Sequence, residues 1–153
     1  AQIDTHLALK RWTTKVKAAD ESVNNSSALQ NDSDITITLL ANGIYAVRGR
    51  LWFNTLAAAD FKYRFVYAGT LLYMKHTSYP AGSSTGISNI DTASPTTTTS
   101  VLGTGTAGGL VEFDALVKCD GANRNFYLQW AQNTATVGNT TVLAGSYIEA
   151  CAG

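Results

Sequence analysis

Apolar side chains occupy every second position of one segment near the C-terminus, and this alternation constrains the fold more than any other feature of the sequence. The alternating residues are Phe126, Leu128 and Trp130. A period of two is typical of a β-strand with one buried face. After a polar segment, a second β-rich stretch ends at Tyr147 and Ile148. We expect the segment from Asn125 to Ala150 to form two strands joined as in a hairpin, with Trp130 and Tyr147 as structural anchors.

The same alternation marks several earlier segments. Apolar or aromatic residues share one face in four of them: Ile35 to Leu39, Tyr45 to Phe53, Phe61 to Tyr67 and Val111 to Val117. Asn42-Gly43 lies between the first two and is typical of a hairpin turn, because both residues tolerate positive φ. The whole pattern predicts about seven to nine short strands and no long helix. The predicted fold is therefore all-β: an antiparallel, jelly-roll-like β-sandwich with an extended N-terminal arm.

Basic residues interleave with the aromatic residues of one predicted strand. Lys62 and Arg64 alternate with the aromatic face of Phe61 to Tyr67, which is compatible with a platform that stacks nucleic-acid bases. The chain has eleven basic and eleven acidic residues, so its formal net charge is zero. No overall field attracts a nucleic acid or a membrane surface. We therefore interpret the aromatic face as sandwich interior.

Charged residues are scarce in this chain. The 153 residues suit one domain, and only 14% of them are charged, against about 25% in ordinary globular domains. Thr, Ser, Asn, Gly and Ala must therefore cover much of the surface. A neutral surface of this kind suits a protein that packs against copies of itself or against a partner.

The N-terminus is locally basic. Asp4 is the only acid in the first seventeen residues, which contain four cations: Lys10, Arg11, Lys15 and Lys17. We divide the chain into a basic arm, residues 1–17, and a single β-sandwich domain, residues 18–153. The arm is either a solvated first strand or a segment laid across an acidic neighbour. Its predicted partner-binding residues are Lys10, Arg11, Trp12, Lys15 and Lys17.

A polar segment from His76 to Pro95 interrupts the strand pattern. Loops longer than about a dozen residues are usually functional or mobile, so we expect partner contact here, through His76 and Tyr79. The alternative for His76 is an ordinary solvated histidine. The segment from Gly103 to Gly109 is expected to be a loose turn, because no Gly-Lys-Ser/Thr sequence follows it as in a phosphate-binding loop.

Residues able to perform chemistry are few and scattered. His6 and His76 are the only histidines, so their spacing with the cysteines matches no zinc site. Ser146 lacks the second glycine of a nucleophile elbow. Glu112 and Asp114 share one strand face, as a carboxylate pair for sugar hydrolysis would, but an outward polar face is the simpler interpretation. We expect no enzymatic activity, no cofactor and no metal site.

The two cysteines and the first residues bear on where the chain folds. Ala1 to Leu9 lacks the apolar run of a signal peptide, and no apolar run approaches the ~20 residues of a membrane helix. We therefore expect Cys119 and Cys151 to be free thiols in a chain that folds in the cytoplasm where it is made.

Several of these segments resemble the β-sandwich residues of tailed-bacteriophage virion proteins. The resemblance extends over roughly Lys15 to Ala150. It is carried by five segments: Lys17 to Val23, Asp32 to Leu39, Asn42 to Leu51, Leu128 to Asn133 and Thr140 to Ala150. These are structural and not catalytic residues, so the resemblance implies a virion structural protein.

The resemblance also implies a location and partners. A single sandwich with a basic arm suits a capsid decoration, or cement, protein, which is made in the host bacterial cytoplasm and sits on the capsid exterior. Its expected partners are the major capsid protein and copies of itself, as a homotrimer, with no nucleic acid and no membrane. The alternatives are a head-fibre or tail-tip module that contacts a host receptor, and a carbohydrate-binding β-sandwich.

Overall fold

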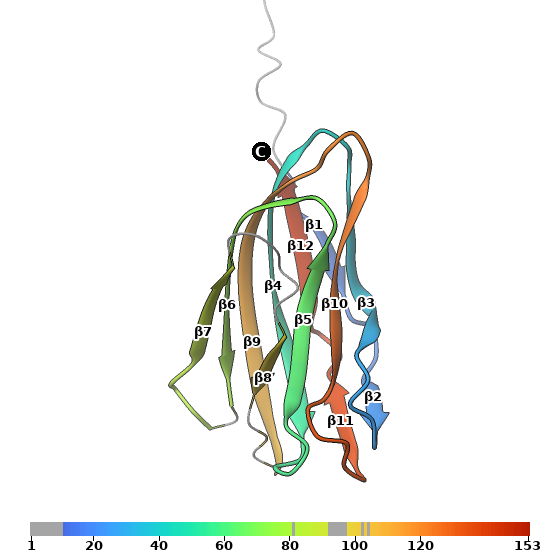
Figure 1. The fold of residues 1–153 in the computed structure, drawn as a ribbon, viewed down its shortest axis with the longest axis vertical. Coiled ribbons are helices and arrows are strands. Elements are labelled where there is room, and N and C mark those ends of the chain that lie inside the picture. Colours follow the sequence, from blue (N-terminus) through green and yellow to red (C-terminus); the bar gives the residue numbers. More distant parts are fainter. Residues whose placement is uncertain (1–10, 81, 92–97, 102, 104) are drawn as a thin grey trace, which may run out of the picture.

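The computed structural model describes residues 11–80, 82–91, 98–101, 103 and 105–153, and these contain twelve β-strands and no helix that could cross a membrane. The strands are β1 (Thr13–Val16), β2 (Glu21–Asn24), β3 (Gln30–Leu39), β4 (Ile44–Thr55), β5 (Phe61–Tyr67), β6 (Thr70–Tyr79), β7 (Ile87–Asp91), β8 (Thr99–Val101), β9 (Gly105–Lys118), β10 (Arg124–Gln132), β11 (Asn139–Val142) and β12 (Tyr147–Ala152). They form two antiparallel sheets (Figure 1).

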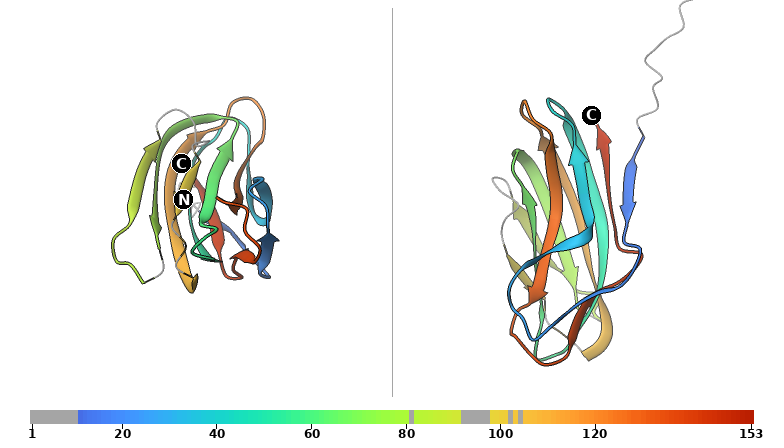
Figure 2. Two further views of the ribbon diagram at one scale, coloured as in Figure 1. Left: turned by 60° about the horizontal axis from the view of Figure 1, so that its bottom comes forward. Right: turned by 90° about the vertical axis from the view of Figure 1, so that its right-hand side faces the viewer.

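The strand order is that of a jelly roll. The larger sheet runs β1-β12-β4-β9-β6-β7, with β11 and β2 added beside β4, and the smaller sheet runs β3-β10-β5-β8. The chain crosses repeatedly from one sheet to the other, and the two layers face each other in Figures 1 and 2. Four strands, β1-β12-β4-β9, thus face β3-β10-β5-β8, while β6 and β7 widen the larger sheet. The predicted all-β, jelly-roll-like sandwich is confirmed.

The alternating apolar positions meet between the two sheets. Trp130 on β10 is fully buried, as are most of the aromatic residues of β5. The ring centroids of Phe53 and Phe61 lie 4.2 Å apart, and those of Phe65 and Phe113 lie 4.3 Å apart. Each of these pairs joins one sheet to the other, because β4 and β9 belong to the larger sheet and β5 to the smaller. The aromatic face of β5 is therefore core, as predicted, and offers no stacking platform.

Both predicted hairpins are wrong, although their strands form. Asn42 has the positive φ that its turn requires, 62°, yet β3 pairs with β10 while β4 pairs with β9 and β12. The segment from Asn125 to Ala150 likewise crosses between sheets, because β10 lies in the smaller sheet and β12 in the larger. A turn signal reports the local backbone and does not specify which strand becomes the neighbour. The loose turn predicted at Gly103 to Gly109 is also wrong, since β9 begins at Gly105.

The last part of the predicted arm forms an exposed edge strand, the first of its two alternatives, while one predicted anchor is wrong. Thr13 to Val16 form β1, which pairs with Tyr147 to Ala150 at the edge of the larger sheet (Figure 1). Residues 1–10, including Lys10, lie outside the described residues. Trp130 is a buried anchor, but Tyr147 is only half-buried because it lies on the outer face of the larger sheet.

Candidate binding surface

Lys17 is a structural residue and not a partner-binding one, so this prediction is corrected. Its side chain is fully buried, and Nζ lies 2.6 Å from Glu21 Oε2 and 3.0 Å from Asp32 Oδ1. Asp32 also accepts a hydrogen bond of 3.1 Å from Trp130 Nε1. Burial alone would lower the pKa of Lys17, but Glu21 and Asp32 more than offset it and raise that pKa. The ammonium therefore stays charged and ties the start of the domain to its core.

His76 does not lie in a loop, so its predicted partner contact is also corrected. It is buried on β6, with Nδ1 2.8 Å from the Tyr63 hydroxyl and Nε2 3.3 Å from Asp91 Oδ2. Burial lowers its pKa, although Asp91 offsets part of the effect, so the ring is neutral at pH 7. Because a carboxylate only accepts, Nε2 donates to Asp91 and Nδ1 accepts from Tyr63.

The remaining predicted partner-binding residues are accessible. Arg11 and Lys15 are exposed, and Trp12 is 38% exposed. The Arg48 guanidinium lies 4.0 Å from the centre of the Trp12 ring, a cation–π contact that holds the indole against the larger sheet. Tyr79, at the end of β6, is half-buried and lines a surface hollow. The structure thus brings Trp12 and Tyr79 to the outer face of one sheet.

Charged residues form two rows across that outer face. Successive strands β6, β9, β4 and β12 place them opposite one another in the register of the sheet. The first row, here called the charged row, is Lys75, Asp114, Arg48 and Glu149. The second row, here called the mixed row, is Thr77, Glu112, Arg50 and Tyr147. Cross-strand pairs of opposite charge stabilise a sheet by roughly 0.2–1 kcal/mol each.

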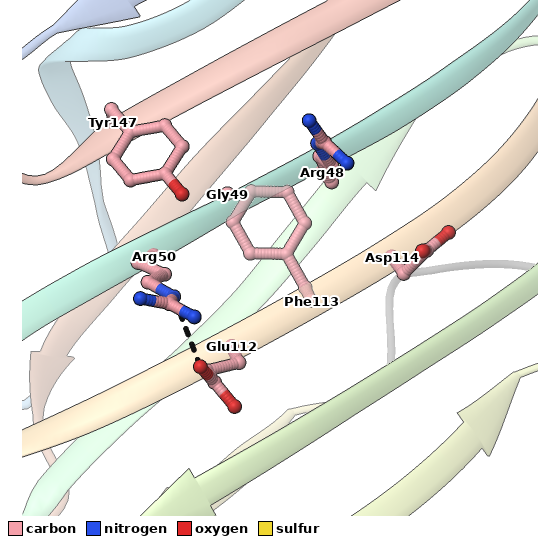
Figure 3. A pocket seen from close by; sticks show the side chains of 7 residues that line it. All are labelled: Arg48, Gly49, Arg50, Glu112, Phe113, Asp114 and Tyr147. Atoms are coloured by element: carbon pink, nitrogen blue, oxygen red, sulfur yellow. Dashed lines mark ion pairs between the residues drawn. The ribbon is translucent and has the colours of Figure 1, made fainter.

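A shallow hollow of about 390 Å³ lies between these two rows on β4, β9 and β12. Arg50 Nε is 2.9 Å from Glu112 Oε1, and Arg48 Nε is 2.6 Å from Glu149 Oε1. Figure 3 shows the Arg50 guanidinium turned towards Glu112, with the Tyr147 ring beside it. The Glu149 carboxylate raises the pKa of Arg48, so this guanidinium stays charged. The hollow is therefore lined by two cationic and two anionic side chains, which supply hydrogen-bond donors and acceptors.

Two smaller hollows continue the first one across β9 and β6. One, of about 220 Å³, includes Lys75, Thr77 and Tyr79, and the other, of about 280 Å³, extends to Pro80 and Leu110. All three hollows share Glu112 as a lining residue. The three hollows therefore adjoin one another at Glu112 on the outer face of the larger sheet, and they are here together called the furrow.

Apolar rows flank the charged ones. Towards one end of the strands the row is Tyr73, Leu116, Ala46 and Cys151, and towards the other it is Tyr79, Leu110 and Trp52. Ten large hydrophobic residues are exposed in the described part of the chain, and six of them lie on this face by their register or contacts: Trp12, Val16, Ile44, Tyr73, Ile90 and Leu116. A concentration of this kind marks an interaction surface.

Sequence reasoning found these residues but not the surface. Glu112 and Asp114 were expected on one strand face, and the same spacing of two residues places Arg48 and Arg50 on one face of their own strand. What joins them into rows is the pairing of β4 with β9, which brings Arg48 to Asp114, 66 positions away in the chain, and Arg50 to Glu112, 62 positions away. No local signal reports that pairing.

Metal-binding groupings do not form in the part of the chain that the structure describes. No set of three His, Cys, Asp or Glu side chains there could hold a metal ion. Glu112 is paired with Arg50, and Asp114 points to the exterior. Cys119 is buried against the Tyr67 hydroxyl, at 3.2 Å, and Cys151 is partly exposed, so both are free thiols. The furrow is suited to binding.

Comparisons with known proteins assign no family to this chain. No family model matches it, and neither does any curated protein. Among solved structures it is similar to the CBM22-1-GH10 modules of Clostridium thermocellum xylanase 10B, complexed with xylohexaose, with 11% identity over 93% of this chain and 26% of that chain, and a TM-score of 0.37. It is also similar to the structure of the Gt strain of infectious bursal disease virus, with 14% identity over 95% of this chain and 41% of that chain, and a TM-score of 0.26. For the Gx strain of the same virus the identity is 12% over 93% of this chain and 40% of that chain, with a TM-score of 0.22. The chain spans less than half the length of each. At these values its function must be argued from its own residues.

Proposed function

We propose that this chain is a non-enzymatic structural protein of a tailed-bacteriophage virion, a capsid decoration protein that binds the outer shell and stabilises contacts between capsomers. The observation that carries the proposal is the outer face of the larger sheet. There, six of the ten exposed large hydrophobic residues of the described chain flank two rows of charge, which is the composition of a protein-contact surface. The resemblance of the strand residues to phage virion proteins supplies the context.

Attachment to the shell is assigned to the N-terminal edge of the same sheet. Arg11 and Lys15 are exposed there without an ion pair among the described residues, and Trp12 stands 38% exposed on the Arg48 guanidinium. Two exposed cations and an aromatic ring on one sheet edge suit an acidic patch of the major capsid protein. Aromatic and Arg side chains are also the residues most often dominant in binding.

Co-sedimentation with undecorated shells tests this function. Arg11→Glu combined with Lys15→Glu is expected to abolish shell binding, whereas Lys62→Glu combined with Arg64→Glu, on the outer face of the smaller sheet, leaves it unchanged. Far-UV circular dichroism confirms that both variants fold. Wild-type protein that fails to bind shells overturns the proposal, and binding to bacterial cells in its place supports a head-fibre or tail-tip module.

A carbohydrate-binding β-sandwich is the second candidate, and one observation favours it. The Trp52 and Tyr147 rings, with centroids 6.3 Å apart, stand beside a hollow whose Arg50 and Glu112 offer both donors and acceptors. Sugars are recognised by such a combination of an aromatic surface and convergent polar groups. Affinity electrophoresis in polysaccharide gels, with Trp52→Ala as the variant, separates the candidates: retardation that this change removes supports sugar binding, and unretarded wild type excludes it for those glycans.

A further inference from the structure

We infer that the outer face of the larger sheet pairs with the same face of a second copy of this chain, about a two-fold axis that runs parallel to β4 and β9 and passes between them. The inference deepens the proposed function, on which it rests for the idea that this face contacts protein. It proposes a two-fold dimer in place of the homotrimer that the resemblance implied, and gives that dimer a defined geometry. A two-fold interface uses one patch on both copies, so that patch must be complementary to itself.

The charged row has this self-complementarity. Its charges alternate as plus, minus, plus, minus across Lys75, Asp114, Arg48 and Glu149. A rotation of the second copy by 180° about an axis between β9 and β4 turns that copy over, so that its charged row crosses the first copy in the opposite order. Lys75 then faces Glu149 of the second copy, and Asp114 faces Arg48 of the second copy. Every charge in the row meets an opposite charge.

The mixed row and the apolar row obey the same operation. Glu112 comes to face Arg50 of the second copy, while Thr77 faces Tyr147. In the apolar row, Leu116, which is 41% exposed, comes to face Ala46 of the second copy. Burial of these apolar side chains supplies the driving force, since charge complementarity contributes orientation and specificity more than affinity.

The other in-plane two-fold axis, perpendicular to the strands, is excluded by the same charges. It would lay the charged row of one copy on the mixed row of the other. Asp114 would then face Glu112, and Arg48 would face Arg50, so like charges would meet at the centre of the interface. Such contacts of like charge oppose association. The charge pattern therefore selects one of the two axes.

Two charges of the face are available for new partners. Neither Lys75 nor Asp114 forms an ion pair within the described part of the chain, although both are exposed and face each other across β6 and β9. The Arg48–Glu149 and Arg50–Glu112 pairs keep their own contacts and gain a second opposite charge on association. In the dimer, every charged side chain of the two rows faces a side chain of opposite charge. This limits the free-energy cost of removing these charges from water.

Charge complementation tests the pairing. Sedimentation equilibrium is expected to show wild-type dimers and a roughly tenfold or greater weakening in either Lys75→Glu or Glu149→Lys, because each variant alone sets like charges against each other at two places. An equimolar mixture of the two variants restores both opposite-charge contacts and should recover the wild-type dimer. Lys62→Glu, on the smaller sheet, is the matched control and should dimerise normally.

A cysteine variant tests the axis. Tyr73→Cys places a thiol opposite Cys151 of the second copy, across the ~10 Å that separates two packed sheets, too far for a direct disulfide but within reach of a short bismaleimide. Cys151 of the same chain lies three strands away, roughly 14 Å at the usual strand spacing and beyond the reach of that reagent. The reagent should therefore yield a covalent dimer from Tyr73→Cys and none from wild type. Monomeric wild type, or a variant mixture that fails to restore dimers, overturns the inference. Shell binding through Arg11 and Lys15 would survive that result, so the two failures are distinguishable.

Discussion

Replacement of Lys17 by Met is expected to destabilise the domain by about 3 kcal/mol, the lower end of the cost of removing one partner from a buried ion pair. Met keeps the volume of the side chain but leaves the carboxylate of Asp32 buried without its counter-charge, at a site with no exposure. The cost stays at the lower end for two reasons. Trp130 Nε1 still donates to Asp32, and the Glu21 side chain is 24% exposed and regains water.

The pH dependence of the same cluster follows from the pKa shifts. Burial alone would raise the pKa of Glu21, but Lys17 and Ser33 lower it below 4.5, while the pKa of Lys17 is raised above 10.5. Because the pKa of Glu21 is lowered in the folded protein, the ionised carboxylate stabilises the fold above pH 4.5, and this stabilisation is lost as the pH falls through the folded-state pKa of Glu21. Because the pKa of Lys17 is raised, the charged ammonium stabilises the fold below pH 10.5, and this stabilisation is lost as the pH rises through the folded-state pKa of Lys17. The difference in stability between wild type and Lys17→Met should therefore be largest from about pH 4.5 to 10.5.

Urea unfolding at pH 7 measures the effect, provided that the m-value is unchanged. The double variant Lys17→Met with Asp32→Asn is the control, because it removes the stranded charge while keeping the shape, and it should recover part of the loss. A loss below about 1 kcal/mol for Lys17→Met, the range of a surface pair, would refute the reasoning. So would a double variant less stable than the single one.

Three further predictions concern other parts of the domain. Gly49→Ala should cost about 1–3 kcal/mol in urea unfolding, because the added methyl would collide with the backbone carbonyl oxygen of Tyr147 and with the Phe113 ring. An unchanged midpoint would contradict this packing. Arg48→Met should cost less than about 1 kcal/mol, since the arginine of the Arg48–Glu149 pair is 51% exposed. His76 has a folded pKa below 6.5, so its neutral form stabilises the fold above pH 6.5 and this stability declines as the pH falls below 6.5. His76→Gln should flatten that decline, and a variant that follows the wild-type pH profile would contradict the assignment.

The strands and their buried faces were predictable from the sequence. Phe126, Leu128 and Trp130 are fully buried, and so are the aromatic residues of β5 apart from a 5% exposure at Tyr67. This success has a local cause, because alternation along a strand is set by the backbone of that strand alone. The short strands were under-counted, since pieces such as β1 and β2 have four residues each and show little alternation.

Which residues lie together was decided only by the tertiary structure. Lys17 looked like one of four equivalent cations, and what distinguishes it is the proximity of Asp32 and Glu21, a consequence of how β3 packs. The rows of the outer face depend on the register between β4 and β9, to which segments distant in the chain contribute. The sequence by itself thus determined strands, core faces and fold class through local periodicity. Sheet membership, buried charge and the binding surface arise from long-range pairing, which no local pattern encodes.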